Sequence, residues 1–426
     1  MRFSRSVALV TLALTVGATT VGVQPAFSLS APLTQVVSDN PVDNTPDVLD
    51  GTVYAIAEVG NRVVVAGSFT KVQRPGAIVT RNLVNIFAYN PNTGKIDMKF
   101  QPAVDGPVET VAAAPGGTDV IVGGYFANVN GSPRRGLVSL SMADGSTNSS
   151  FVGKTNAAVH KILVRGNKLI VGGRFTKVND VTHLGLAVMD ATTGQLDSNF
   201  NIGVEGSRKP SLLPIPIVFE MDATADGSRL IILGNFLTVN GLDHNQVAII
   251  NMTNYTVMPW ASTETESMCG SSVSFFFADV EIDPTGTFFA LVARGGYSST
   301  DLCDTVTRWE LDGTDTSAEP TWTNWTGGDT LWSVAVTPAA VYIAGHPRWL
   351  DNYGCNNTKC PGSVDREGIA AVDPATGEVL AWNPGRARGV GAQELVATNR
   401  GLYVGSDTER IGGEIHKRLA MFPSLG

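Results

Sequence analysis

The chain has 426 residues, a formal net charge of −9 and a composition that is 43% hydrophobic and 16% charged, with 46 glycines and 22 prolines. This hydrophobic content is enough to build a substantial core, which excludes a wholly disordered chain. The acidic balance argues against a nucleic-acid partner, which needs a basic face, and gives no electrostatic reason to bind anionic lipid. Low charge with many glycines favours short strands and tight turns over long solvent-facing helices.

The N-terminus has the pattern of a secretory signal peptide. Two arginines precede an apolar stretch over residues 7–23, and Ala26 and Ser28 place small residues at a cleavage site. We therefore expect a signal peptide over residues 1–28, a mature domain over residues 29–426, and a protein that is secreted, extracellular or associated with the cell surface. The alternative is an uncleaved membrane anchor. No later stretch is long and apolar enough to predict membrane insertion.

Four cysteines in an exported chain predict two disulfides, for which three pairings exist. Cys355 and Cys360 lie in one loop, and Cys269 and Cys303 flank one strand-rich segment. We expect the pairs Cys355–Cys360 and Cys269–Cys303. A metal site is the rival interpretation, but there is no Cys-x-x-Cys motif and no histidine at ligand spacing, so no metal is expected here.

One pattern recurs along the whole mature chain. A β-branched run is followed by a glycine and then by an aromatic residue, as in residues 63–69 (VVVAGSF) and 120–126 (VIVGGYF). The copies are 49 to 61 residues apart. The marker glycines are Gly67, Gly124, Gly173, Gly234, Gly295, Gly345 and Gly405.

Each copy contains further shared parts that predict four short strands. An apolar strand precedes the marker, and a tight Gly- or Asn-containing turn joins the two. A third strand follows and, in several copies, ends in a turn such as Asn-Thr-Gly, after which an aromatic residue returns. These aromatic residues are Phe100, Phe151, Phe200, Trp260, Trp325 and Trp382. The repeat predicts an all-β fold, a single seven-bladed β-propeller of four-stranded antiparallel blades.

The last copy stops before a fourth strand, whereas residues 33–42 are left over at the start of the mature chain. We expect this N-terminal segment to join the last blade as its outer strand and so to close the ring.

The strings at residues 63–69 and 170–175 (IVGGRF), with DATTGQLDSNF after the second, resemble delta-60-type repeats of secreted bacterial β-propellers. The resemblance implies a recognition module rather than an enzyme. In architecture and export the chain also resembles, more loosely, propeller-type lectin subunits of actinomycete umbrella toxin particles.

Comparison of the copies points to one variable face. In an up-and-down blade, the connections between strands two and three and between strand four and the next strand one lie on the same side of the ring. The long insertions fall in these connections, and long loops on a rigid scaffold commonly carry function. They span residues 203–216, 261–274, 294–305 and 346–366.

A second comparison concerns the residue after the first apolar position of each first strand. In a propeller this position circles the central channel, and packing of identical repeats does not explain unlike side chains there. The ring could hold a ligand or be filled by satisfied polar groups and water. Its members are Tyr54, Glu109, His160, Phe219, Ala278, Trp332 and Gln393.

The insertion over residues 346–366 contains Arg348, Trp349 and Tyr353. An aromatic face beside polar groups suits a sugar, and it would equally suit a protein partner. The alternative is that this loop simply packs on the blade.

The histidines give no catalytic constellation. His183, His244 and His416 share one register, which predicts a repeated structural contact in separate blades. No nucleophile elbow, metalloprotease helix or phosphate-binding loop is present in the sequence. No catalytic residue and no cofactor are therefore expected, with structural calcium at the recurrent Asp and Asn turns left open.

These observations predict a non-enzymatic extracellular recognition module that binds cell-surface glycan through the inserted-loop face. The alternative is a protein–protein scaffold or adaptor subunit of a secreted assembly, such as a toxin. A third interpretation is a glycan hydrolase or lyase at the channel mouth, with Glu109, Glu220 or His160 as its acids and base.

Overall fold

A computed structural model describes residues 33–209, 211–266, 269, 276–296 and 301–425. The predicted signal peptide lies outside these residues. The regular secondary structure of the described residues consists of strands, apart from the short helical turn η1 (Thr263–Glu266). None of its helices has the length and apolar character needed to cross a membrane. The prediction of an all-β fold is confirmed.

Seven sheets of the described residues, called here the central sheets, share one strand order. A first strand pairs with a second and the second with a third, always antiparallel. The first four sheets contain β2 (Val53–Val59), β3 (Arg62–Gly67) and β6 (Ile86–Tyr89); β7 (Val108–Ala113), β8 (Asp119–Gly124) and β11 (Leu137–Ser141); β12 (Val159–Arg165), β13 (Lys168–Gly173) and β16 (Leu186–Asp190); and β18 (Val218–Ala223), β19 (Arg229–Gly234), β22 (Val247–Asn251) and β23 (Thr256–Val257). The last three contain β24 (Phe277–Ile282), β25 (Phe288–Ala293), β26 (Thr305–Glu310) and β27 (Trp322–Trp325); β28 (Leu331–Val336), β29 (Val341–Gly345) and β32 (Ile369–Val372); and β33 (Ala392–Thr398), β34 (Gly401–Ser406) and β37 (Leu419–Pro423).

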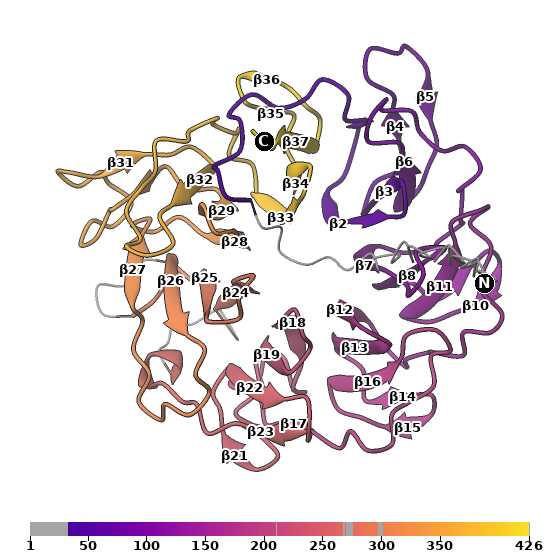
Figure 1. Cartoon of the computed structure of the whole chain (residues 1–426), viewed down its shortest axis with the longest axis horizontal. Coiled ribbons are helices and arrows are strands. Elements are labelled where there is room, and N and C mark those ends of the chain that lie inside the picture. The colour runs from indigo at the N-terminus through magenta and orange to yellow at the C-terminus, as the bar shows by residue number, and fades with distance from the viewer. Residues whose placement is uncertain (1–32, 210, 267–268, 270–275, 297–300, 426) are drawn as a thin grey trace, which may run out of the picture.

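The central sheets follow one another around a common centre, with their first strands innermost (Figure 1). Each first strand contacts the first strand of the next sheet, and β33 of the last sheet contacts β2 of the first. The first strands therefore surround the middle of the molecule, where the candidate site lies.

The expected fourth strand is formed in only two of the central sheets of the described chain, as β23 and β27. In four others it is reduced to a single bridge, such as Tyr89 with Ile96. The prediction of uniformly four-stranded sheets is wrong because the chain leaves the sheet soon after this bridge. Phe100 then turns into the core with Ile86 and Val104 and is fully buried.

In six of the central sheets of the described chain, the connection from the second to the third strand contains a hairpin with two residues per strand. We call these hairpins the hairpin layer, and the sequence analysis did not predict them. Its hairpins are β4 (Val72–Gln73) with β5 (Thr80–Arg81), β9 (Asn128–Val129) with β10 (Ser132–Pro133), β14 (Lys177–Val178) with β15 (Val181–Thr182), β20 (Thr238–Val239) with β21 (Leu242–Asp243), β30 (Trp349–Leu350) with β31 (Val364–Asp365), and β35 (Arg410–Ile411) with β36 (Glu414–Ile415). In five of the central sheets of the described chain, the segment that enters the sheet pairs with this layer, as β1 (Asp47–Val48) does with β4 and β17 (Val204–Glu205) with β20.

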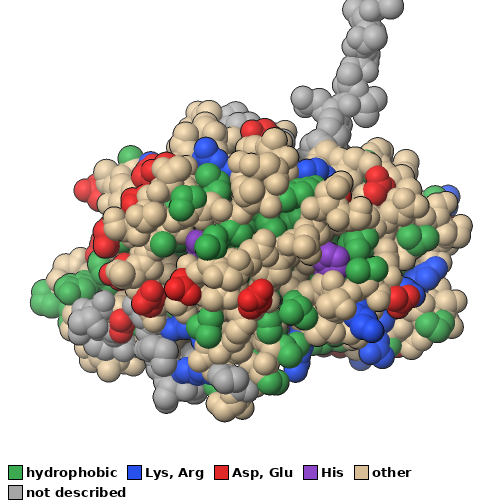
Figure 2. Space-filling model, turned by 90° about the horizontal axis from the view of Figure 1, so that it is seen from below, with side chains coloured by type: hydrophobic (Ala, Val, Ile, Leu, Met, Phe, Trp, Pro, Cys, Tyr) green, Lys and Arg blue, Asp and Glu red, His purple; other side chains and the backbone are tan. Residues whose placement is uncertain are grey.

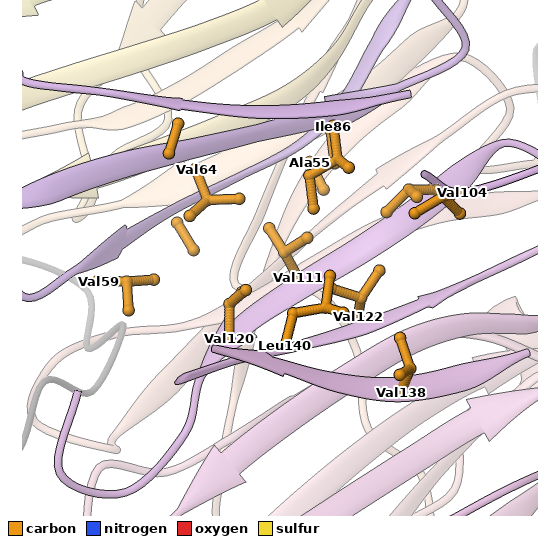
Figure 3. Close-up of a cluster of buried hydrophobic side chains, with 14 of the residues drawn as sticks. Ala55, Val59, Val64, Ile86, Val104, Val111, Val120, Val122, Val138 and Leu140 are labelled. Carbon is orange, nitrogen blue, oxygen red and sulfur yellow. The ribbon is translucent and has the colours of Figure 1, made fainter. Parts of the chain in front are cut away.

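Apolar side chains fill the layers between neighbouring central sheets. Figure 3 shows one such layer, in which Val64 of the first sheet faces Val111 and Val122 of the second. Each large apolar side chain buried in this way contributes about 1.5–3 kcal/mol. The sheets therefore stabilise one another through their faces.

The N-terminal segment lies beside the last central sheet but forms no strand of it. Ser38 N donates to Pro423 O at 3.0 Å, and Val42 N donates to Met421 O at 2.9 Å. Four residues of the segment thus span two residues of β37, and Pro41 between them has no N–H to donate. A regular strand cannot form with this spacing, although the segment and the last sheet lie side by side in Figure 1.

Both predicted disulfides are present. Cys269 is bonded to Cys303, with 5.4 Å between their Cα atoms, and Cys355 is bonded to Cys360, with a corresponding distance of 5.6 Å.

Candidate functional site

Every first strand carries a β-bulge at the predicted ring position. In β2, Val53 is opposite Gly67 and Ala55 is opposite Ala66, so Tyr54 is the extra residue. A bulge leaves its extra residue unpaired and re-aims its side chain. The bulge residues are Tyr54, Glu109, His160, Phe219, Ala278, Trp332 and Gln393.

The bulge also explains the marker glycine. A Cβ atom added at Gly67 would lie 2.0 Å from the backbone oxygen of Thr52, which enters the bulged strand. Real Cβ atoms do not approach backbone oxygen so closely, so any other residue at Gly67 would force the neighbouring backbone to shift.

In the fifth and seventh central sheets the predicted marker is displaced. The residues that stand opposite the start of the first strand are Ala293 and Ser406, rather than Gly295 and Gly405. The sequence pattern placed these two markers wrongly because the register, and not the nearest glycine, defines the position.

The bulge residues converge on one cavity in the middle of the molecule. It has a volume of about 260 Å³ and is lined by all six of the ring residues predicted to bind a ligand, which are Tyr54, Glu109, His160, Phe219, Trp332 and Gln393. We call this space the channel cavity.

Three aromatic rings form one side of its mouth. The centroid of His160 lies 5.4 Å from that of Tyr125 and 4.9 Å from that of Phe219. The hydroxyl of Tyr125 lies 3.3 Å from Nε2 of His160. The sequence analysis did not predict Tyr125. It directly follows the marker Gly124, just as Ser68 follows Gly67, and Ser68 also contacts a ring residue, Tyr54. The position after the marker glycine could therefore have indicated Tyr125.

Glu109 and His160 face each other at this side of the mouth, with Oε2 and Nδ1 4.0 Å apart. Burial raises the pKa of Glu109 to about 7. Burial, aided by the positive charge of Arg174, lowers the pKa of His160 to about 4. At neutral pH the imidazole is therefore uncharged, and the pair offers hydrogen-bond donors and acceptors rather than a strong ion pair.

The opposite side of the mouth is built around Trp332. The guanidinium of Arg294 lies 5.2 Å from its ring centroid, and the indole N–H donates to Val390 O at 2.9 Å. Nδ1 of His346 is 2.8 Å from the same carbonyl oxygen. Because His346 opens the insertion over residues 346–366, the mouth of the channel cavity adjoins the inserted-loop face.

Deeper in the cavity, a cluster of charged side chains surrounds Lys161. Its Nζ lies 2.8 Å from Oε2 of Glu220. Burial opposes the charge of the lysine, but the carboxylates of Glu220, Glu394 and Asp279 outweigh it and raise the pKa of Lys161 well above its usual value. The lysine and Glu220 keep 23% and 24% of their side chains exposed, since the cavity admits water.

Other polar residues of the first strands hold neighbouring sheets together. Asp279 accepts a hydrogen bond from Val334 N at 2.9 Å, and Asp222 accepts one from Ile282 N at 2.9 Å. Burial raises the pKa of Asp222. The positive charge of Arg165, whose Nη2 lies 3.0 Å from Oδ1 of Asp222, partly offsets this increase. Each of these two acids therefore joins its own first strand to the first strand of the next sheet.

The predicted loop residues lie apart from the channel cavity. Trp349 belongs to β30 of the hairpin layer, so this part of the insertion is a repeated element rather than an irregular loop. Arg348 lies 4.3 Å from the Trp349 ring centroid and 2.8 Å from Asp329. Tyr353 is 57% exposed. The nine predicted binding residues therefore divide into six in the cavity and three outside it.

A family model supports the β-propeller fold for part of the chain. A family model described as a β-propeller domain of unknown function (DUF5122) matches residues 120–151, which run from β8 to the aromatic residue that ends the repeat. The computationally designed Ika8 protein is 11% identical, with a TM-score of 0.47 over 91% of this chain and 99% of that chain. No curated protein matches the chain. Over residues 120–151, which are part of one repeat, the chain is thus similar to a β-propeller family.

Proposed function

We propose that this protein is a secreted, non-enzymatic recognition module that binds a terminal sugar of a cell-surface glycan at the mouth of the channel cavity. The observation that carries the proposal is the convergence of six unlike side chains, each at a bulge, on a single cavity. Repeat packing needs the bulge but not this variety of side chains.

The chemistry of the mouth suits a sugar ring. Phe219, His160 and Trp332 offer aromatic faces for the apolar side of a pyranose, while Glu109 and Gln393 offer groups that bond hydroxyls. Small-molecule pockets typically combine such apolar walls with a few placed polar groups. A cavity of about 260 Å³ suits one sugar unit better than a longer chain.

Recognition is favoured over hydrolysis because one of the two acids expected for catalysis is occupied. Glu220 forms an ion pair with Lys161 at 2.8 Å. Burial raises the pKa of Glu220 to about 8, against the opposing effect of Lys161. A general acid must also point its O–H at the leaving group, however, and Oε2 of Glu220 faces the ammonium of Lys161 instead.

The scaffold interpretation ranks second. Large exposed hydrophobic side chains are scattered along the sequence, from Ile78 to Leu425. In the face shown in Figure 2, hydrophobic groups alternate with charged ones. A stable protein interface usually has a more continuous apolar centre.

We also propose that the seven central sheets are the blades of a closed propeller of the delta-60 repeat type. Contact between β33 and β2, and the bond from Ile56 N to the carboxylate of Glu394, support the joining of the last sheet to the first. The backbone bonds of Ser38 and Val42 support closure by the N-terminal segment. The two disulfides support an extracellular location.

A glycan array with the purified mature protein tests the proposed function. The affinity of a glycan found in this way is then measured by titration for the parent protein and for the Trp332→Ala and Trp349→Ala variants. We expect Trp332→Ala to weaken binding at least 10-fold and Trp349→Ala to leave it unchanged. Melting temperatures of both variants control for folding. Loss of binding in Trp349→Ala alone would move the site to the insertion, and the absence of any bound glycan would overturn the proposal.

A further inference from the structure

Away from the channel cavity, three potential metal ligands from the two ends of the chain meet beside the hairpin layer. Ligand atoms of Asp43, Glu414 and His416 all lie within 4.8 Å of one another. Among the described residues, no other group of three such side chains meets this criterion. They line a pocket of about 170 Å³ that also includes Thr45 and Asp47.

His416 is the buried member of this group, and one of its ring nitrogens has no hydrogen-bond partner. The residue is 7% exposed, and within the described chain Nε2 forms no hydrogen bond. A buried polar atom without a partner costs free energy, so it calls for an explanation. The nearest carboxylate oxygen, Oε2 of Glu414, is 3.4 Å away.

The other ring nitrogen has a contact of its own. Nδ1 of His416 lies 3.4 Å from the hydroxyl of Thr45, which also lies 3.2 Å from Leu419 O. With Nδ1 engaged there, Nε2 is the ring atom that faces Glu414.

We propose that Asp43, Glu414 and His416 bind a divalent cation of the Zn²⁺ class. A cation bound between these three side chains gives Nε2 the partner that it lacks. One imidazole and two carboxylates are ligands that Zn²⁺ accepts at about 2.0–2.2 Å, whereas Ca²⁺ prefers six to eight oxygen ligands. Asp43 and Glu414 are exposed, so their carboxylates can rotate to close the remaining distance. The pocket leaves room for water as a further ligand.

The second-shell contact favours the same assignment. Metal-bound histidines usually donate their other ring N–H to a neighbouring oxygen, which fixes the ring. Thr45 plays this part for His416. Asp43 belongs to the N-terminal segment, whereas Glu414 lies in β36 and His416 follows it. The cation therefore joins the N-terminal segment to the hairpin layer beside the last central sheet.

The test is a titration of the metal-free mature protein with Zn²⁺ and, separately, with Ca²⁺. We expect one Zn²⁺ per chain by elemental analysis. At 100-fold excess over the dissociation constant, Zn²⁺ should raise the melting temperature by about 3 °C. Hydrogen exchange of residues 33–48 should slow when Zn²⁺ is bound. Ca²⁺ should have a smaller effect at the same concentration.

Substitutions locate the site. Asp43→Asn and His416→Gln should each weaken Zn²⁺ binding at least 10-fold, and Asp43→Asn, which changes an exposed side chain, should leave the metal-free protein folded. His183→Gln, at the same register in another sheet, and Asp39→Asn, on the same segment, are the matched controls and should bind normally. Unchanged Zn²⁺ binding in Asp43→Asn and His416→Gln, or no binding by the parent protein, would overturn the proposal.

Discussion

The channel cavity and the insertion over residues 346–366 were both singled out by variation between repeats, yet they differ in construction. In the cavity, variation occurs at one register, and every bulge sends its residue to the same place. In the insertion, variation is in length, and Arg348 and Trp349 are held by local partners while Tyr353 points outward. Variation at a fixed position in a circular repeat therefore locates a shared site, whereas variation in length locates only an exposed surface.

The largest expected effect distinguishes these regions by stability. Lys161→Met removes the cation that stands among Glu220, Glu394 and Asp279. Leaving buried charges without their partner costs about 3–5 kcal/mol in the interior. The Lys161 and Glu220 side chains are 23% and 24% exposed. We therefore expect a loss near the lower end of this range, about 3 kcal/mol in the free energy of unfolding at pH 7, measured by urea denaturation.

Lys154→Met is the matched control. This lysine also pairs with an acid, Asp180, at 2.7 Å, but the two side chains are 50% and 82% exposed. Exposed pairs contribute about 0–1 kcal/mol. Similar losses in both variants would show that the channel charges are no more important than surface charges.

The second effect is a pH dependence at the mouth of the cavity. Burial raises the pKa of Glu109 to about 7 from a usual value near 4.5. The folded protein thus holds a proton that the unfolded chain has released, so the stability due to this group is present below pH 4.5 and is lost as the pH rises to 7. The loss is about 2 kcal/mol, reduced for the 27% of the side chain that is exposed.

Glu109→Gln removes this titration. The variant should match the parent protein at pH 4.5 and exceed its stability by about 2 kcal/mol at pH 8, as determined by denaturation at each pH. His160 also titrates, in the opposite sense because burial lowers its pKa, but it is present in both proteins and largely cancels from the difference. A difference that does not change with pH would mean that Glu109 is ionised throughout.

Much of the fold was readable from the sequence because repetition makes it redundant. Seven imperfect copies predict the first and second strands, the turns between them and the ring positions. The copies place Tyr54 and Trp332 at the same register, and the structure has a bulge at each. The bulge itself is a property of pairing between strands, so composition could not predict it. The same holds for the marker position, which the strand pairing gives to Ala293 and Ser406 in the fifth and seventh central sheets.

Other elements were too short to predict. Hairpins of two residues per strand, such as β9 with β10, have no measurable periodicity. The clustering of Asp43 with His416 depends on how the ends of the chain meet, which local sequence does not specify. Lys161 follows the ring residue His160 in the sequence, but its three acid neighbours lie on other first strands and come near it only when these strands are arranged around the cavity.

The smallest expected effect belongs to the insertion. The ring of Tyr353 lies 4.8 Å from that of Trp325, in an edge-to-face contact, and the side chain is largely exposed. Aromatic pairs of this kind contribute about 0.5–1.5 kcal/mol, so Tyr353→Ala should reduce the free energy of unfolding by about 1 kcal/mol or less. It should leave glycan binding unchanged, because the residue lies outside the channel cavity. A loss as large as that of Lys161→Met would show that the insertion supports the fold as strongly as the channel does, and the contrast between the two regions would then disappear.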